Sequence, residues 1–453
     1  MKKIYIITFV LGLVACNGDL DIKPQQSLDQ SVALSNDANV KKVLLGAYDG
    51  ISGFSQALGS YGFLWGGDIL MFSELLAADG ELTWVGTYNQ PREVYGKKIL
   101  TNNSFTRANW TGGYYTINIC NNILEAIDKV NEDDRDRVKG EALFIRGAVY
   151  FELVRFFGQS YSAGNTSSNL AVPIVLKGTT KIDESSFVKR ATVEEVYQQV
   201  LSDLTEAEAL LPDENDVYAT KSVAAAILSR VYLGMADYTN AAAAADRVIG
   251  SGLFELTPTY EGAFNNSSNS TEDIFAMQVN EQDGNNDMQL YWSTSEYGAR
   301  DGDVQINDKH LTYYEDGDAR LDMFYDSNGA RRTTKWQQQY KILPIARLAE
   351  MYLTRAEANL RLGTAVGDTP ENDLNAIRDR VGLDPITDPT LDDILHERKV
   401  ELAFEGSAIH DLKRLKGTAD GFAYNANAMI FPIPAREISA NPNLVQNDGY
   451  SAN

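Results

Sequence analysis

The residues best suited to recognise a ligand lie in two long stretches, 54–110 and 253–340, which are rich in glycine, asparagine, aspartate and aromatic residues. Aromatic rings offer flat apolar faces to the C–H surfaces of pyranose sugars, and amide, carboxylate and guanidinium groups bond to sugar hydroxyls. The residues that combine these chemistries are Trp84, Tyr88, Asn89, Gln90, Tyr291, Trp292, Tyr297, Arg300 and Asp301. Their types and loop positions predict an oligosaccharide-binding surface.

Each of these aromatic side chains could instead be a buried anchor that holds its own loop in place, and both alternatives remain open. Trp65, which follows Phe63 and Leu64, fits the core better, as does Trp110 at the start of an expected helix. Trp336 could belong to either class. The binding surface is therefore a hypothesis from position and chemistry.

Catalytic and metal-binding patterns are weak in this chain. His310, His396 and His410 are scattered and have no cysteine partner at zinc spacing, and no nucleophile elbow or phosphate loop occurs. The acidic loops 301–303 and 316–318 do not continue into the 12-residue ligand pattern of a calcium loop. We expect no catalytic residue, no cofactor and no metal.

Three glutamates, Glu397, Glu401 and Glu405, recur at helical spacing and could suggest the carboxylate pair of a glycosidase. Structural salt bridges and solvated charge are the more common roles of such a row. We expect these glutamates to form structural salt bridges and to carry solvated charge.

Cys16 follows the most apolar run of the chain. Residues 1–15 combine the positive charge of Lys2 and Lys3 with an apolar segment too short to span a bilayer, which predicts a signal peptide. The run Leu13-Val14-Ala15-Cys16 resembles the bacterial lipobox, in which the cysteine thiol is acylated after cleavage. A plain signal peptide with an incidental cysteine is the alternative.

The remaining composition is that of a folded extracytoplasmic chain. We expect a flexible lipidated tether over residues 16–35, a single domain over 36–453, and Cys120 as a small core residue. The net charge of −23 argues against binding to nucleic acid and against direct adhesion to anionic lipid, so that contact with a membrane would be through the anchor alone.

Helical periodicity dominates the domain. A capping box at Thr192 and Glu195 opens one amphipathic run, and a long helix is expected from Thr390 to about Leu415. The alanine-rich pair 219–235 and 238–249 resembles a tetratricopeptide hairpin. We predict a mainly α fold of irregular tetratricopeptide-like helix pairs with long loop insertions, the pairs lying mainly within 115–255 and 343–415. An ordinary helical bundle is the alternative.

Several segments, in a fixed order, resemble the SusD/RagB family of surface lipoproteins. They are Gly140–Gly158, Ile345–Leu353, Ala356–Ala358, Leu374–Arg378, Ile394–Gly406 and the terminal motif within 430–450, which runs from Pro432 to Tyr450. The family usually has an arginine two residues after the Glu405-Gly406 pair, where this chain has Ala408. An ion pair at that position is therefore in doubt, and we expect Glu401 or Glu405 to contact Arg398, Arg414 or a helix terminus instead.

This resemblance implies a SusD-like α-superhelical fold and a binding protein that is not an enzyme. It also implies a place on the outer face of the outer membrane, where the protein would present oligosaccharides to a SusC-like TonB-dependent transporter. The ligand residues of the family vary with substrate, so none is transferred. Two alternatives remain open: the protein could capture a non-glycan nutrient such as a peptide, or it could be a surface glycoside hydrolase.

Overall fold

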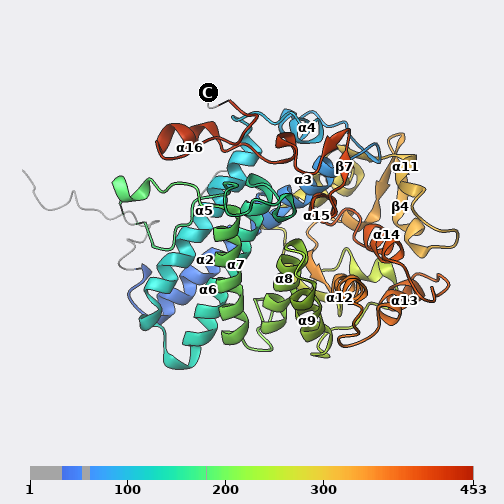
Figure 1. Ribbon diagram of the computed structural model, residues 1–453, viewed down its shortest axis with the longest axis horizontal. Coiled ribbons are helices and arrows are strands. Elements are labelled where there is room, and N and C mark those ends of the chain that lie inside the picture. The colour runs from blue at the N-terminus through green and yellow to red at the C-terminus, as the bar shows by residue number, and fades with distance from the viewer. Residues whose placement is uncertain (1–32, 54–61, 180, 452–453) are drawn as a thin grey trace, which may run out of the picture.

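The computed structural model describes residues 33–53, 62–179 and 181–451, and it has a mainly α fold, as predicted (Figure 1). Cys16, the signal peptide and nearly all of the predicted tether lie outside the described residues. The helices are α2 (Asp37–Ser52), α3 (Asp68–Ala77), α4 (Asn89–Tyr95), α5 (Ser104–Glu125), α6 (Glu132–Phe157), α7 (Val193–Leu210), α8 (Lys221–Gly234), α9 (Tyr238–Ile249), α10 (Asp287–Trp292), α11 (Asp308–Leu311), α12 (Leu348–Leu362), α13 (Pro370–Arg380), α14 (Leu391–Glu401), α15 (Ala408–Arg414) and α16 (Ala435–Ala440).

The long helices pack in sequence against one another. Contacts run from α2 to α5, and then through α6, α7, α8 and α9 to α12 and α13 (Figure 1). The alanine-rich pair is present as α8 and α9, where Ala241, Ala244 and Ala245 are fully buried. Such small side chains let the backbones of neighbouring helices approach closely, as the sequence indicates.

Helix ends follow the predicted capping residues. The Thr192 hydroxyl accepts a hydrogen bond from Glu195 N at 3.2 Å, and Thr192 N donates to the Glu195 carboxylate at 2.7 Å. Thr390 and Asp393 form the same reciprocal cap on α14, while the Thr220 hydroxyl caps α8 by accepting from Val223 N. Such caps satisfy backbone N–H groups that have no partner within the helix.

Residues 54–110, expected from their composition to be a long irregular region, are instead partly helical. In its described part this segment contains α3, α4 and the start of α5. Every residue of α3 is buried, because the helix crosses the interior of the molecule. A helix that is buried on all sides lacks the one-sided pattern of apolar residues by which amphipathic helices are recognised.

The expected long helix from Thr390 to Leu415 is also interrupted. Its first part, α14, ends at Glu401, and α15 begins at Ala408. Between them Phe404 and Gly406 have φ angles of 66° and 85°, which turn the chain out of the right-handed helix. A Cβ on Gly406 would lie 2.9 Å from Leu70 Cα, so the close approach of α3 requires glycine here.

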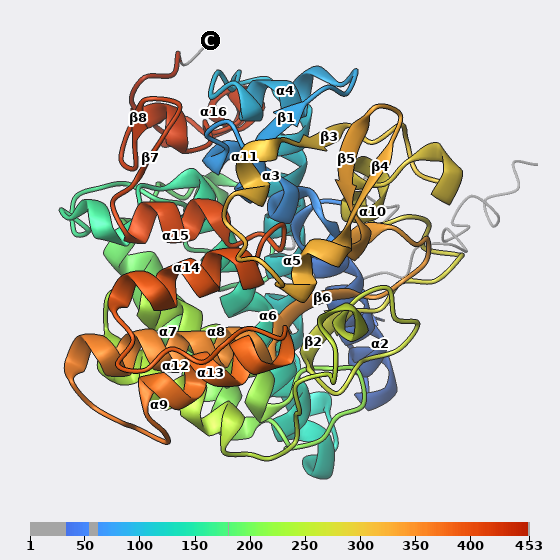
Figure 2. The same ribbon diagram turned by 90° about the vertical axis from the view of Figure 1, so that its right-hand side faces the viewer.

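The strands are short, and the pairs β1–β3 and β2–β6 join segments that are distant in the sequence, whereas β4–β5 and β7–β8 are local hairpins (Figure 2). They are β1 (Leu82–Trp84), β2 (Asp273–Met277), β3 (Val304–Ile306), β4 (Phe324–Ser327), β5 (Ala330–Thr333), β6 (Leu343–Arg347), β7 (Thr418–Ala419) and β8 (Phe422–Ala423). One sheet has the order β1-β3-β5-β4, and the pairs β2–β6 and β7–β8 are separate. In the antiparallel pair of β1 and β3, Leu82 lies opposite Ile306 and Trp84 opposite Val304. This pairing joins the stretches 54–110 and 253–340, which contain the candidate ligand-binding residues.

The three glutamates of α14 and its C-terminal turn form buried salt bridges, as predicted. Glu397 pairs with Arg320 at 2.6 Å, Glu401 with Arg380 at 2.5 Å, and Glu405 with Lys335 at 2.6 Å. The part of the prediction that gave them solvated charge is wrong, since Glu397 and Glu401 are 1% and 0% exposed.

Arg347 contacts both Glu401 and Glu405, at 3.2 and 2.8 Å. Arg398 and Arg414, which were expected to be their partners, bind Asp411 instead. The prediction failed because the actual partners lie far along the chain and come close only through the pairing of β2 with β6 and the packing of α13.

Candidate ligand-binding surface

The pairing of β1 with β3 places residues 85–89 beside residues 295–303. Val85 N donates to the Asp303 carbonyl at 2.8 Å, and Arg300 Nη2 donates to Thr87 Oγ1 at 2.9 Å. Two loops more than 200 residues apart in the sequence therefore form one surface.

Arg300 and Tyr88 form the centre of this surface. The guanidinium carbon of Arg300 lies 4.1 Å from the centroid of the Tyr88 ring, and Arg300 Nε donates to Asp303 at 2.5 Å. A guanidinium over an aromatic ring is attracted by the electrons of the ring face. Asp303 and Thr87 thus fix the position of Arg300, and Arg300 in turn orients Tyr88.

Tyr88 remains accessible despite this contact. Its side chain is 41% exposed, and its ring makes edge contacts with Phe105 at 6.0 Å and Tyr291 at 6.3 Å between centroids. The adjacent Asn89 is exposed at the start of α4, where its side-chain oxygen accepts from Arg92 Nη1 at 3.0 Å. An aromatic ring and an amide therefore stand next to each other in contact with solvent.

Trp84, Tyr291 and Trp292 are only 5%, 2% and 1% exposed. The expectation that their rings are open to a ligand is wrong in this structure, and the buried-anchor alternative describes them. Trp84 packs against Tyr291 at 5.8 Å and Trp292 against Phe404 at 4.9 Å. These apolar rings fill the space beneath the two loops, and they therefore support the surface from within the core.

Tyr297 and Asp301 are on the same loop as Arg300. Tyr297 is half-buried and packs edge-on against Tyr325 at 6.0 Å, while Asp301 is exposed and accepts from Ser295 Oγ at 2.9 Å. Six of the predicted residues thus reach the surface: Tyr88, Asn89, the half-buried Gln90, Tyr297, Arg300 and Asp301.

Thr87 and Asp303 were missed as functional residues by the sequence analysis. Both act by holding Arg300, and Asp303 forms an i, i+3 ion pair with it at 2.5 Å. Asp303 could have been found from that spacing. Thr87 could not, because its contact depends on the pairing of β1 with β3.

A buried pair of carboxyl groups lies beneath the surface. Asp68 begins α3, Asp287 begins α10, and the two side chains interact with each other while being only 2% and 3% exposed. Burial raises the pKa of Asp287 to about 7 and that of Asp68 well above its usual range, where the neighbouring Asp287 adds to the rise. The pair therefore holds protons near neutral pH, and it fixes the helix that carries Tyr291 and Trp292.

The other tryptophans and Cys120 belong to the core. Trp65 and Trp110 are buried, as predicted, and Trp336 is also buried and donates from Nε1 to the Phe404 carbonyl at 2.9 Å. Cys120 is fully buried, and this burial raises the pKa of its thiol to about 12. These residues are unsuited to ligand contact.

Metal-binding groups of three or more histidine, cysteine, aspartate or glutamate side chains are not found within residues 33–53, 62–179 and 181–451. In the same ranges no helix has the length and apolar character needed to cross a membrane. Burial lowers the pKa of His310 to about 3, so its ring is neutral and packs against Phe404 at 4.5 Å.

Two family models match the chain. Residues 20–233 match the model described as starch-binding and associating with the outer membrane, and residues 211–430 match the SusD family model. The two matches overlap and together follow the chain from residue 20 to residue 430.

Individual relatives agree with these matches. The SusD-like protein P2 of Formosa agariphila is 25% identical over 99% of this chain and 100% of its own length. The starch-binding protein SusD of Bacteroides thetaiotaomicron is 33% identical over 126 residues, which are 24% of this chain and 21% of that protein.

Solved structures with a similar fold belong to the same superfamily. A crystal structure of a SusD superfamily protein from Bacteroides thetaiotaomicron is similar with a TM-score of 0.80 and 25% identity, covering 90% of this chain and 99% of that one. The order of helices, the motifs of the C-terminal third and both family models agree, and the chain belongs to the SusD/RagB family.

Proposed function

We propose that this protein is a surface lipoprotein of the outer membrane that binds an oligosaccharide and delivers it to a SusC-like TonB-dependent transporter. The observation that carries the proposal is the exposed Tyr88 ring held by Arg300, where two distant loops meet. The ring offers an apolar face, and Asn89, Asp301 and Arg300 offer planar polar groups. Starch binding in the name of one relative supports a glycan as the ligand class.

The role as a binding protein without catalysis is part of the same proposal. The carboxylates of Glu397 and Glu401 are fully engaged with arginines in the interior, which makes them unsuited to attack a glycosidic bond. The family to which the chain belongs supports a location in the outer membrane, with Cys16 as the lipid-bearing residue.

Isothermal titration calorimetry against a panel of oligosaccharides tests the binding surface. We expect Tyr88→Ala to weaken the best ligand by about tenfold or more, because stacking on an aromatic ring contributes roughly 1–2 kcal/mol. Tyr238→Ala on α9 is the matched control, since this half-buried tyrosine is on another part of the fold. Equal affinity of the wild type and Tyr88→Ala would show that the binding site is not at Tyr88.

Transport and anchoring need separate measurements. Co-purification with a TonB-dependent transporter together with no affinity for any sugar would favour a non-glycan nutrient. Labelling with palmitate that persists in Cys16→Ala would contradict the proposed anchor.

A further inference from the structure

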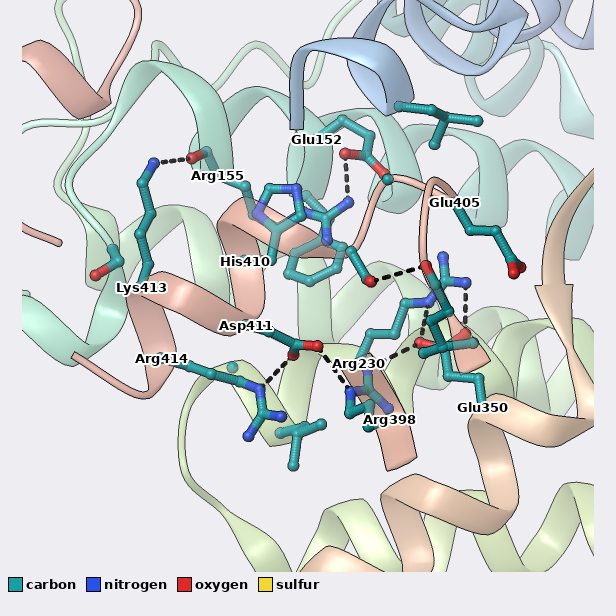
Figure 3. A pocket seen from close by; sticks show the side chains of 18 of the residues that line it. Glu152, Arg155, Arg230, Glu350, Arg398, Glu405, His410, Asp411, Lys413 and Arg414 are labelled. Atoms are coloured by element: carbon teal, nitrogen blue, oxygen red, sulfur yellow. Dashed lines mark hydrogen bonds and ion pairs between the residues drawn. The ribbon is translucent and has the colours of Figure 1, made fainter. Parts of the chain in front are cut away.

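A cavity of about 80 Å³ lies where α6 and α8 meet α12, α14 and α15 (Figure 3). Its walls carry six basic side chains and four acidic ones. The basic ones are Arg155, Arg230, Arg347, Arg398, Lys413 and Arg414. A local excess of positive charge in the interior contrasts with the net charge of −23 of the chain.

Most of these cations have an acidic partner. Arg230 binds Glu350 at 2.6 Å, and Asp411 lies between Arg398 and Arg414, which bind it at 2.9 and 2.6 Å (Figure 3). Such pairs are electrically balanced, so they do not call for a further ligand.

Lys413 differs from these residues. Its side chain is 2% exposed, and Nζ donates to the Arg155 backbone carbonyl at 3.3 Å (Figure 3). Among the described residues no carboxylate oxygen lies within 4.0 Å of this ammonium group. Arg155 Nε and Arg414 Nη2 are also buried N–H groups without a hydrogen-bond acceptor.

The neighbours of Lys413 add to the excess of positive charge around its ammonium group. Burial, and next the charge of Arg155, lower the pKa of Lys413 to about 7. Burial and the charges of Arg155, Lys413 and Arg230 all lower the pKa of His410. Glu152 is the nearby carboxylate, and it is already bound by Arg155 and by Trp65 Nε1. Buried charges in proteins are normally compensated, and the Lys413 ammonium group has no carboxylate that compensates it.

We propose that this cavity binds one small tetrahedral oxyanion, of the size of sulfate or phosphate, with Lys413 and Arg155 as its principal donors. The volume corresponds to about two to three water molecules, which is the size of such an ion. The cavity shares Arg398, Ser407 and Asp411 with an adjoining groove of about 410 Å³. The bound ion would hold α15 against the C-terminal end of α6.

Calorimetric titration of the full chain with sodium sulfate, and separately with phosphate, at constant ionic strength and near neutral pH tests this proposal. We expect one site per chain and a loss of affinity of about tenfold or more in Lys413→Met, because a charge-assisted hydrogen bond to the ion is removed. Lys42→Met is the control, since Lys42 is exposed on α2. Equal binding by the wild type and Lys413→Met would overturn the proposal.

A second measurement separates binding from general effects of salt, since sulfate stabilises most proteins by exclusion from their surface. In the presence of sulfate we expect the titration of Lys413, followed by NMR of the labelled side chain, to move above its value of about 7. Lys413→Met should remain folded, because it replaces an unpaired buried charge by an apolar chain of similar length. An unchanged Lys413 titration would show that the cavity holds water only.

Discussion

At the scale of single residues, the candidate surface depends on side chains that hold one another in place. Tyr88 is exposed because Trp84 and Tyr291 fill the core beneath it, and Arg300 is ordered by Asp303 and Thr87. Preorganised groups of this kind lose little conformational entropy when a ligand binds. The buried aromatic residues therefore contribute to binding through the position of the exposed ones.

The pair of Asp68 and Asp287 makes the stability of this region depend on pH. Its folded-state pKa values lie above the ordinary value of 3.8, so the folded protein holds protons that the unfolded chain releases. The stabilisation of the folded state by these retained protons is fully present below pH 3.8 and is lost as the pH rises through about 7.

The free energy of unfolding of the wild type should therefore fall between acidic and alkaline pH. In Asp287→Asn we expect this fall to be smaller by about 1–3 kcal/mol. Urea unfolding followed by circular dichroism at several pH values measures this difference. Asp316→Asn, which changes an exposed carboxylate, is the control. Parallel pH profiles for the wild type and Asp287→Asn would contradict the prediction.

At the scale of secondary-structure elements, the break between α14 and α15 shapes the C-terminal third. The chain leaves α14 after Glu401, turns through Phe404 and Gly406, and re-enters a helix at Ala408. Glu74 on α3 accepts hydrogen bonds from Gly406 N at 2.8 Å and from Ala408 N at 3.4 Å. Backbone N–H groups of the turn therefore bind this buried carboxylate.

A substitution at Gly406 tests the close packing of this turn. Gly406→Ala would need a left-handed φ of 85° and would place its Cβ 2.6 Å from Leu70 Cδ2. We expect a loss of about 3 kcal/mol in the free energy of unfolding, from strain and overpacking together.

Gly363→Ala is the matched control for this change. Gly363 also has a positive φ, of 66°, but a Cβ there would meet nothing within 4 Å. The control should lose only about 1 kcal/mol from the backbone conformation. Similar midpoints of urea unfolding for the two variants would show that α3 does not crowd the turn.

At the scale of the whole molecule, a network of buried charges joins distant parts of the chain. Glu272 lies directly before β2, Arg347 ends β6, Arg380 ends α13 and Glu401 ends α14. Glu272 binds Arg347 and also Arg380, the latter at 2.6 Å, and Arg380 binds Glu401. Although burial disfavours a charged carboxylate, the guanidinium groups of Arg380, Arg347 and Arg320 lower the pKa of Glu401 to about 2.

We expect Glu401→Gln to destabilise the protein by about 3–5 kcal/mol near neutral pH, because it leaves buried arginines without compensation. The contribution of Glu401 is present above its ordinary pKa of 4.5 and is lost as the pH falls toward 2, so the variant should also show a flatter acid profile. Thermal and acid unfolding measure both effects. Glu214→Gln, at an exposed position, should match the wild type.

Much of the architecture could be predicted from short-range patterns. The capped helix at Thr192, the alanine-rich pair of α8 and α9, buried Cys120 and the structural role of Glu401 were all recognisable, because each depends on spacing within a few turns or on residue type. The apolar helix α3 was missed, since burial on every side removes the periodic signal. The family motifs also predicted the fold class, because their order along the chain can be recognised without knowing any tertiary contact.

The contacts that make the candidate surface and the anion cavity required the folded structure. Trp84 and Tyr88 are four residues apart and have similar side chains, yet one is buried and the other is exposed because β1 ends between them. The partners of Glu401 and the isolation of Lys413 likewise depend on strands and helices that meet across large sequence separations. Residue type determines which chemistry a side chain can perform, whereas its burial and its partners follow from long-range packing.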